Sequence, residues 1–464
     1  MNQLTWRKFA APLVFGASVL AGTLSMTAAA HAFCGFYVGK ADASLFNDAS
    51  QVIMARDGNR TVISMLNDYK GQLTEFALVV PVPSVLSREQ INVGDRKIFD
   101  RIDGYSSPRL AEYHDSNPCD NGRRAEMMMG GAPPTAPVSA PKASADKALG
   151  VAVEASYTVS EYDIVILSAN QSDGLETWLI QNGYRIPAGA SKALGPYIKQ
   201  QMKFFVAKVN IKEQKRSGNQ TLRPIQFAFE SEKFMLPLRL GMLNSNGPQD
   251  LIVYMLTRQG RVESTNYRTV KLPANMDLPV FIRGEFNDFY KAFFSQQAQR
   301  ENLRAVFTEY FWDMAWCDPC AANPLSEDEL KSAGVFWLGK EQSNDGQSQQ
   351  NSQRRFVPQQ GANPVMLTRL HVRYTRDSFP EDLMFQETQD RQNFQTRYVL
   401  RHPYKGPTDC EAARGYLEQV ARRQDKEAQV LADLTGWQLS SIKQKMPAQF
   451  SAKPSNWWNA IWPR

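Results

Sequence analysis

The sequence predicts an α+β fold with mostly antiparallel sheets, interspersed helices and a long C-terminal helix. Short apolar runs rich in β-branched and aromatic residues recur along the chain, and most are joined by short links, which favours antiparallel pairing. Apolar residues at helical spacing occur in only a few stretches, the longest of them near the C-terminus. With 464 residues, the chain is long enough to bury a core that needs no disulfide in order to fold.

Changes in composition divide the sequence into six segments. They are a signal peptide at 1–32, an N-terminal β-rich part at 33–120, a disordered Ala/Pro-rich linker at 121–149, a central α+β part at 150–341, a Gln/Asn/Ser-rich loop at 342–362, and C-terminal strands and helices at 363–464.

The N-terminus has the three parts of a secretory signal. Arg7 and Lys8 form a basic start, an apolar run follows, and small residues lead to Ala32. Cleavage after Ala32 satisfies the small-x-small pattern, so we expect a periplasmic or secreted protein. Phe33 stands before Cys34 where a lipoprotein needs a small residue. An uncleaved membrane anchor is the alternative, because the apolar run approaches spanning length.

The N-terminal part is predicted to begin with a β meander. Two apolar runs flank Asp57-Gly58-Asn59, a turn that supplies positive φ and indicates a hairpin. A third strand is expected over 73–80, before the prolines at 81 and 83, and a helix over 95–102. The linker after this part contains Met127-Met128-Met129. Clustered thioethers suit soft copper, but the composition favours a flexible linker.

The central part is predicted to alternate strands with two helices and to end in an aromatic strand. One helix begins at Ser172, and another spans 285–301 with a Phe stripe that indicates a core-facing side. The run 307–316 is interpreted as a buried strand, and a capping box at 326–329 begins a short helix. The other expected strands are 151–157, 162–167, 204–209, 224–229, 251–256 and 262–270.

The C-terminal part is predicted to hold strands at 367–374 and 395–400 and a helix over 409–435. The apolar face of this helix includes Ala412 and Val420.

Three tryptophans lie close to the C-terminus, Trp457, Trp458 and Trp462. Their spacing suits a peripheral contact with a membrane interface. Docking on the protein's own surface is the favoured interpretation.

Five cysteines lie beyond the signal: Cys34, Cys119, Cys317, Cys320 and Cys410. In an oxidising compartment most should be paired, and the odd number leaves one over, but the connectivity does not follow from sequence. A Cys317–Cys320 bridge closes a tiny loop and stabilises by roughly 2 kcal/mol, whereas a Cys119–Cys410 bridge would contribute about 5 kcal/mol. The adjacent pair is therefore a poor choice for stability alone, which keeps a redox function open.

The run Trp316-Cys-Asp-Pro-Cys320 resembles the active-site corner of thioredoxins, with Asp where that family has Gly. The flanks disagree with that fold, because the local helix begins after Cys320 and the following loop lacks apolar periodicity. We therefore favour a structural disulfide and keep a redox pair and a metal site as alternatives.

Other chemistries have weak sequence support. The histidines His114, His371 and His402 are not at ligand spacing from one another, so we expect no metal site and no cofactor. No Gly-x-Ser-x-Gly elbow and no glycine-rich phosphate loop occurs. The net charge of +6 falls by two when the signal is removed, which argues against nucleic acid as a partner.

Several short sequence segments together resemble the bacterial domain-of-unknown-function family 2330. The segments are Ala77-Leu-Val-Val-Pro-Val-Pro83, Tyr162-Asp-Ile-Val-Ile-Leu167, Trp178-Leu-Ile-Gln-Asn-Gly-Tyr184, Leu236-Pro-Leu-Arg-Leu-Gly241, Trp316-Cys-Asp-Pro-Cys320 and Tyr398-Val-Leu-Arg-His402. The resemblance extends from about Cys34 to beyond Cys410. It implies an exported bacterial protein and no particular activity.

These observations favour a non-enzymatic, envelope-associated protein that binds an unknown protein or envelope component or has a structural role. The competing hypothesis is a periplasmic thiol–disulfide redox protein that uses Cys317 and Cys320.

Overall fold

A computed structural model describes most of the chain between residues 36 and 446. The described residues are 36–39, 46–70, 76–120, 151–169, 172–184, 186–187, 189–210, 222–244, 247–316, 318, 323–338 and 364–446. The predicted signal peptide, the Ala/Pro-rich linker, the 342–362 loop and the three C-terminal tryptophans lie outside them.

The described elements combine many strands with helices, so the predicted α+β class is confirmed. The strands are β1 (Phe36–Gly39), β2 (Phe46–Asp57), β3 (Arg60–Lys70), β4 (Phe76–Val82), β5 (Ile91–Val93), β6 (Arg109–His114), β7 (Val151–Val159), β8 (Tyr162–Ala169), β9 (Lys203–Val209), β10 (Ile225–Glu230), β11 (Met235–Leu236), β12 (Gln249–Thr257), β13 (Val262–Ser264), β14 (Arg268–Lys271), β15 (Met276–Leu278), β16 (Ala305–Asp313), β17 (Met366–Tyr374), β18 (Leu383–Glu387), β19 (Phe394–Gln395) and β20 (Arg397–His402). The helices are α1 (Arg96–Ser106), α2 (Ser172–Gln181), α3 (Ala190–Lys199), α5 (Phe286–Arg300), α6 (Glu327–Ser332), α7 (Glu411–Thr435) and α8 (Leu439–Lys445), with short 3-10 turns η1 (Arg88–Gln90), η2 (Arg239–Asn244) and η3 (Val280–Arg283).

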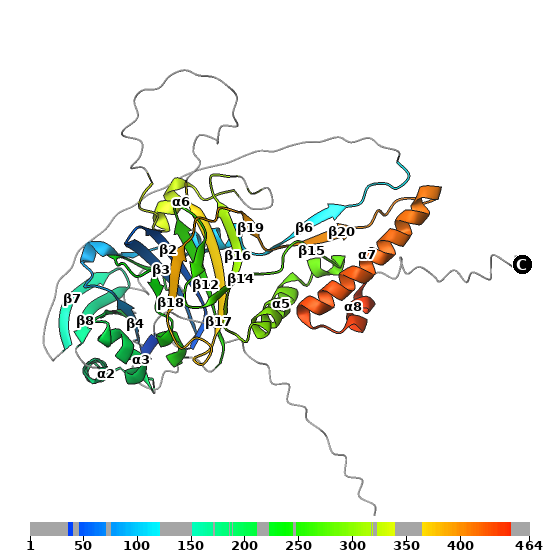
Figure 1. Cartoon of the computed structure of the whole chain (residues 1–464). Helices are drawn as coiled ribbons and strands as arrows, with labels where there is room; N and C mark the ends of the chain where they lie inside the picture. The colour runs from blue at the N-terminus through cyan, green and yellow to red at the C-terminus, as the bar shows by residue number, and fades with distance from the viewer. Residues whose placement is uncertain are drawn as a thin grey trace, which may run out of the picture.

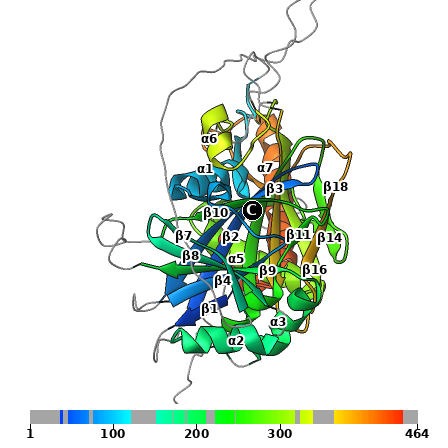
Figure 2. The same cartoon turned by 90° about the vertical axis from the view of Figure 1, so that its left-hand side faces the viewer.

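Two large sheets form the body of the molecule (Figures 1 and 2). The five-stranded sheet has the order β1-β4-β9-β8-β7 and is antiparallel throughout. The nine-stranded sheet follows the path β14-β16-β17-β12-β2-β3-β10-β5, with β19 beside β16. Its pairs β2–β12 and β14–β16 are parallel, and the others are antiparallel. A small antiparallel sheet, β11-β18-β13, is not hydrogen-bonded to these two but contributes Leu236, Val262 and Leu383 to the core between them.

Strand periodicity explains why the two sheets pack face to face. In β2, Val52 and Met54 enter the core between the sheets, whereas Ile53 and Ala55 enter the core on the opposite face. Successive side chains of a strand point to opposite faces, so a strand with a core on each side needs a continuous apolar run. The runs that the sequence shows in β2, β4 and β12 meet this requirement.

Helices cover the outer faces of both sheets. Helices α2 and α3 pack on the five-stranded sheet, and α1 and α6 pack on the nine-stranded sheet. Asp95 caps α1, because its side chain accepts a hydrogen bond from the Lys97 backbone N–H at 2.9 Å. The predicted capping box at Ser326 and Glu329 is also present.

A third unit extends from the body and is called the C-terminal arm. It consists of the parallel sheet β15-β20-β6 with α5, α7 and α8, and Figure 1 shows it to one side of the two large sheets. Phe289 and Phe293 of α5 are buried against Tyr398 of β20, as the predicted Phe stripe requires. None of the described helices is long and apolar enough to cross a membrane.

The structure corrects several boundaries. The strand predicted over 262–270 is two strands, β13 and β14, because the chain turns where the Ser264 backbone N–H bonds Thr269 Oγ1. Helix α3 was not predicted, since Gly195 and Pro196 lower its helix propensity. In the first turn of α7 the buried alanine is Ala413, and Ala412 is exposed.

Candidate functional site

A cavity of about 270 Å3 lies between the two large sheets. Its walls are mainly apolar and come from β3, β4, β10 and β11 together with the turn after α3. The side chains that matter for its chemistry are Ile63, Met65, Val80, Met202, Phe229 and Met235.

Strand pairing places the β3 and β10 side chains of the cavity on one face. In the antiparallel β3–β10 pair, Ile63 lies opposite Phe227 and Met65 lies opposite Ile225. All four residues belong to the core between the sheets, because residues two apart in a strand share a face. Pro81 lines the cavity where β4 has passed the end of its pairing with β1, which stops at Val79. A proline there leaves no backbone donor unsatisfied at the strand edge.

Arg56 fixes the loop that forms one rim of the cavity. Its Nη2 donates to the carbonyls of Ser231 at 3.0 Å and Glu232 at 3.3 Å, and its Nη1 donates to Thr61 Oγ1 at 2.8 Å. The guanidinium also lies 4.8 Å from the centre of the Phe234 ring. Burial lowers the pKa of Arg56 below its ordinary value. The rim is therefore held in place before any ligand arrives.

The mouth of the cavity is polar. Lys233 Nζ donates to Gln200 Oε1 at 2.8 Å, and both residues line the opening together with Glu232. An apolar interior beside a charged and amide-bearing edge suits a molecule with an apolar body and a polar end.

A separate network of buried charges crosses the nine-stranded sheet. Its centre is Glu309, whose side chain is fully buried. The register of β16 against β17 shifts between Thr308 and Tyr310, so Glu309 is the extra residue of a β-bulge. Glu309 accepts hydrogen bonds from Arg369 Nε at 2.5 Å, from His371 Nδ1 at 2.6 Å and from the Tyr290 hydroxyl.

The network continues to both sides of Glu309. Arg369 Nη1 donates to Asp103 Oδ1 of α1 at 2.6 Å. On the other side, His371 Nε2 lies 3.6 Å from Asp250 Oδ1, and Asp250 pairs with Arg373 at 2.6 Å. The His371 ring stacks on Phe294 of α5, with ring centres 3.6 Å apart. The network thus connects α1, the strands β12, β16 and β17, and α5.

These contacts shift the protonation of the network. Burial opposes ionisation, yet His371 and Arg369 lower the pKa of Glu309 to about 2. Burial also opposes the charge on His371, but Glu309 and Asp250 raise the pKa of His371 above its ordinary value. Glu309 and His371 are less than a tenth exposed and do not line the cavity, so their contacts are those of an internal support.

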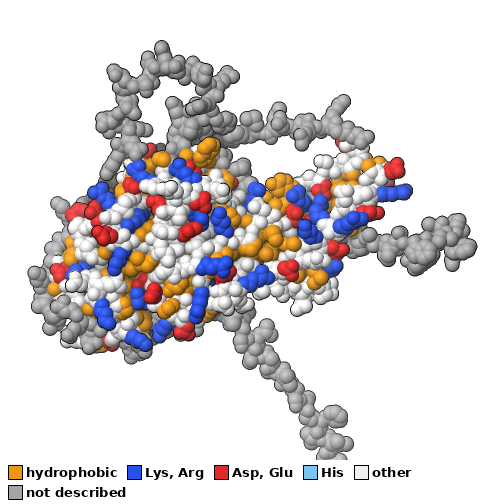
Figure 3. Space-filling model, viewed as in Figure 1, with side chains coloured by type: hydrophobic (Ala, Val, Ile, Leu, Met, Phe, Trp, Pro, Cys, Tyr) orange, Lys and Arg blue, Asp and Glu red, His pale blue; other side chains and the backbone are white. Residues whose placement is uncertain are grey.

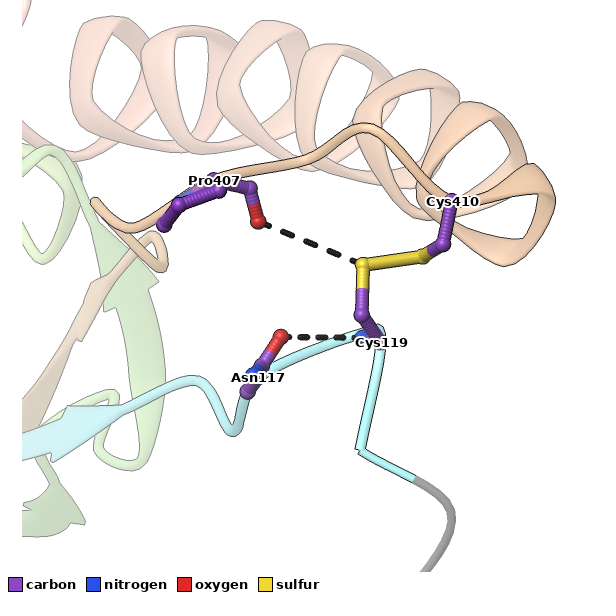
Figure 4. The surroundings of a disulfide bond; sticks show 4 residues. All are labelled: Asn117, Cys119, Pro407 and Cys410. Atoms are coloured by element: carbon purple, nitrogen blue, oxygen red, sulfur yellow. Dashed lines mark hydrogen bonds between the residues drawn. A yellow bond between two sulfur atoms is a disulfide. The ribbon is translucent and has the colours of Figure 1, made fainter.

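One disulfide is present among the described residues. Cys119 and Cys410 are joined across a sequence separation of 291 residues. Figure 4 shows that the bond ties the segment after β6 to Cys410, the N-cap residue at the start of α7. The Cys119 backbone N–H donates to Asn117 Oδ1 at 2.9 Å, and Cys119 Sγ lies 4.0 Å from the Pro407 carbonyl oxygen. This bridge is one of the pairings that the sequence left open.

The Cys-x-x-Cys pair and Cys34 lie outside the described residues. Asp318, between Cys317 and Cys320 in sequence, is described and only 5% exposed. Its Oδ2 accepts hydrogen bonds from the Tyr310 hydroxyl at 3.0 Å and from Gln395 Nε2 at 2.9 Å. Trp316, by contrast, is 58% exposed, because β16 ends at Asp313, earlier than predicted.

Two of the three histidines beyond the predicted signal peptide come together although they are far apart in sequence. His114 of β6 and His402 of β20 are register partners in a parallel pair, and their rings stack with centres 4.5 Å apart. His402 Nε2 lies 2.7 Å from Glu112 Oε2. Among the described residues, no three His, Cys, Asp or Glu side chains form a group that could hold a metal ion.

Comparison with known proteins places the chain by sequence. The profile of DUF2330, described as an uncharacterized protein conserved in bacteria, matches residues 28–386. The chain belongs to this family. The match includes both large sheets of this DUF2330 chain except β19, and it ends before β19, β20, α7 and α8. Neither the curated proteins nor the solved structures yield a match.

Replacing His371 with Gln should change how stability depends on pH. The raised pKa of His371 means that its charge stabilises the fold fully below about pH 6.5 and that this contribution is lost as pH rises through the folded-state pKa. A tenfold change in the proton affinity of one group corresponds to about 1.4 kcal/mol of stability. Urea unfolding at about pH 5.5 and about pH 9 should show a larger alkaline loss in the natural protein than in His371→Gln.

The exposed His114 provides the matched control for this experiment. His114→Gln should keep the natural pH profile, because His114 lies outside the Glu309 network. Equal alkaline losses in the natural protein and His371→Gln would contradict a charged His371. Unfolding measurements at acid pH provide a further check. The stability contributed by ionised Glu309 is present above about pH 4.5 and is lost as pH falls towards 2.

Removing the disulfide should destabilise the arm. The double variant Cys119→Ser/Cys410→Ser should lower the free energy of unfolding by about 2–5 kcal/mol, because the bond closes a very long loop. Urea denaturation under oxidising conditions measures this change, and reductant added to the natural protein should reproduce it. An unchanged midpoint in the double variant would contradict the expectation.

Proposed function

We propose that this chain is an exported, non-enzymatic binding protein of the bacterial envelope that holds a small apolar ligand, or the apolar end of an amphiphile, between its two large sheets. The cavity lined by Met65, Met202, Phe229 and Met235 is the observation that carries the proposal. Export is supported by the sequence of the first 32 residues, with cleavage expected after Ala32.

The size and lining of the cavity favour this ligand class. Its volume of about 270 Å3 lies just below the roughly 300–1000 Å3 of pockets that enclose drug-sized molecules. It therefore suits a small molecule or one end of a longer chain. Each Å2 of apolar ligand surface removed from water contributes about 25 cal/mol. Methionine side chains add adaptability, because they fill irregular spaces around ligands of differing shape.

The rim supports an amphiphile over a purely apolar ligand. Lys233 and Gln200 stand at the mouth, where the polar end of a bound molecule would lie. On the face of the molecule in Figure 3, basic and acidic side chains are interspersed, which fits a protein without a nucleic-acid partner. A membrane contact through Trp457, Trp458 and Trp462 stays a prediction of the sequence and would bring such a protein close to amphiphiles.

A cavity-filling variant tests the binding role. Met235→Trp should weaken binding of the fluorescent amphiphile 1-anilinonaphthalene-8-sulfonate by about tenfold or more, because the indole occupies the ligand volume. Fluorescence titration of the purified mature chain measures the affinity, and unlabelled fatty acids should displace the probe.

Met384→Trp is the matched control for this titration. Met384 is the register partner of Met235 on β18, is equally half-buried and does not line the cavity, so probe binding should be unchanged. A natural protein that binds no probe, or equal losses in both variants, would overturn the proposal. Turnover in a broad hydrolase or reductase screen would overturn its non-enzymatic part.

A thiol–disulfide role for Cys317 and Cys320 is the second candidate. The exposure of Trp316, the residue before Cys317, favours an accessible pair. The burial of Asp318 and its two hydrogen bonds favour a structural turn.

Mass mapping of thiols in glutathione buffers separates the two roles of this pair. A redox pair should be reduced and reoxidised reversibly, whereas a structural bridge should resist the glutathione pool. If either cysteine is bonded to a third one, the redox role fails.

A further inference from the structure

A second cavity, of about 610 Å3, lies within the C-terminal arm. It is bounded by η3, by the segment that follows β20, by α7 and by the end of α8. Its apolar wall includes Val280, Phe281, Leu417 and Met446. Most residues of the full cavity lining lie beyond residue 386, where the family match ends.

Glu427 of α7 contributes a buried carboxyl group to this cavity. The residue is 2% exposed, and its Oε1 has no hydrogen-bond partner. The nearest cation is Arg423, whose Nε lies 3.4 Å from that oxygen. The Nη1 and Nη2 of Arg423 donate to the Asp115 carboxylate at 3.2 and 2.7 Å, whereas its Nε, like Glu427 Oε1, has no hydrogen-bond partner. A buried polar atom without a partner is costly, and one that lines a cavity can be satisfied by a ligand.

Burial favours the protonated form of Glu427. Burial raises the pKa of Glu427 to about 8, and Asp277 and Asp115 act in the same direction against Arg423 and Arg401. Arg401 is itself paired with Asp277 at 2.9 Å. At neutral pH the side chain is therefore a carboxylic acid, which can donate a hydrogen bond.

The remaining polar lining makes the cavity positive. Lys405 is exposed and has no ion-pair partner among the described residues. His402 is paired with Glu112 at 2.7 Å. Lys445, which does not line the cavity, pairs with Glu285 at 2.6 Å and lies 5.5 Å from the centre of the Phe281 ring. With Glu427 neutral, Lys405 supplies the one uncompensated charge among these lining side chains.

We propose that this cavity binds an organic monocarboxylate whose carboxylate group accepts a hydrogen bond from Glu427 and pairs with Lys405, while its apolar body lies against Phe281 and Leu417. A neutral acid donating to an anion gives a short, charge-assisted hydrogen bond. A cationic ligand is disfavoured, since it would meet Lys405 and would have to ionise Glu427.

Calorimetric titration with benzoate and with the matched cation benzylamine tests the proposal. The mature chain carries Met235→Trp in this experiment, so that the cavity between the sheets does not contribute. Benzoate should bind at about pH 6.5, and its affinity should fall about tenfold at about pH 9, because only the protonated fraction of Glu427 is competent. Benzylamine should not bind.

Variants of Glu427 and Lys405 assign the effect to this site. Glu427→Gln keeps a neutral donor of the same shape, so benzoate binding should persist and lose its pH dependence. Glu427→Ala and Lys405→Ala should each weaken binding about tenfold or more. Lys426→Ala, an exposed neighbour outside the cavity, should leave binding unchanged.

Three outcomes would overturn the inference. They are no benzoate binding at either pH, binding that ignores every Glu427 substitution, and binding of benzylamine that Glu427→Gln abolishes. The last outcome would assign the cavity to cations. Because Glu427→Ala could weaken the fold, thermal melting of each variant accompanies the titrations, and a carboxyl-carbon NMR titration follows the ionisation of Glu427 directly.

Discussion

The buried bond between Glu309 and Arg369 is the interaction on which the rest of the structure depends. It lies at a β-bulge in the nine-stranded sheet, and the same carboxylate holds His371. Buried charges are costly unless each is paired and hydrogen-bonded, so the strands and helices around them have little freedom to shift. Helix α1 is held through Asp103 and α5 through Tyr290, which fixes both the outer layer of the body and the base of the arm.

The apolar layers and the charged groups contribute differently to the two cavities. Alternating strand residues close the sandwich and leave a gap where methionines and a strand-edge proline meet. Arg56 holds the rim in place by hydrogen bonds to two backbone carbonyls of the rim. Ligand binding would therefore cost little free energy for ordering the rim. In the arm, charged groups shape the cavity more than apolar ones do. Asp115 and Asp277 pair with Arg423 and Arg401, and the pKa of the buried Glu427 is raised. One cavity is thereby apolar with a polar edge, and the other has a single acidic donor inside.

Local signals predicted much of the fold, and long-range pairing decided the rest. The turn at Gly58 and the capping box at Ser326 and Glu329 follow from backbone chemistry within a few residues, and both are present. Glu309 lies in a run that reads as an aromatic strand, and only its partner strand makes it the extra residue of a bulge. The adjacency of His402 to His114 comes from parallel pairing of distant strands. Glu427 lies on an apolar helix face, where a single sequence gives no sign of protonation.

The disulfide between Cys119 and Cys410 also has a topological consequence. Both large sheets, save the strands before Cys119, lie inside the covalent loop that it closes. If one peptide bond between these two cysteines were cleaved, the disulfide would still join the two fragments covalently. A single nick within the long Ala/Pro-rich linker would therefore release no piece in an oxidising compartment. The two fragments would remain one covalent molecule until the bridge was reduced.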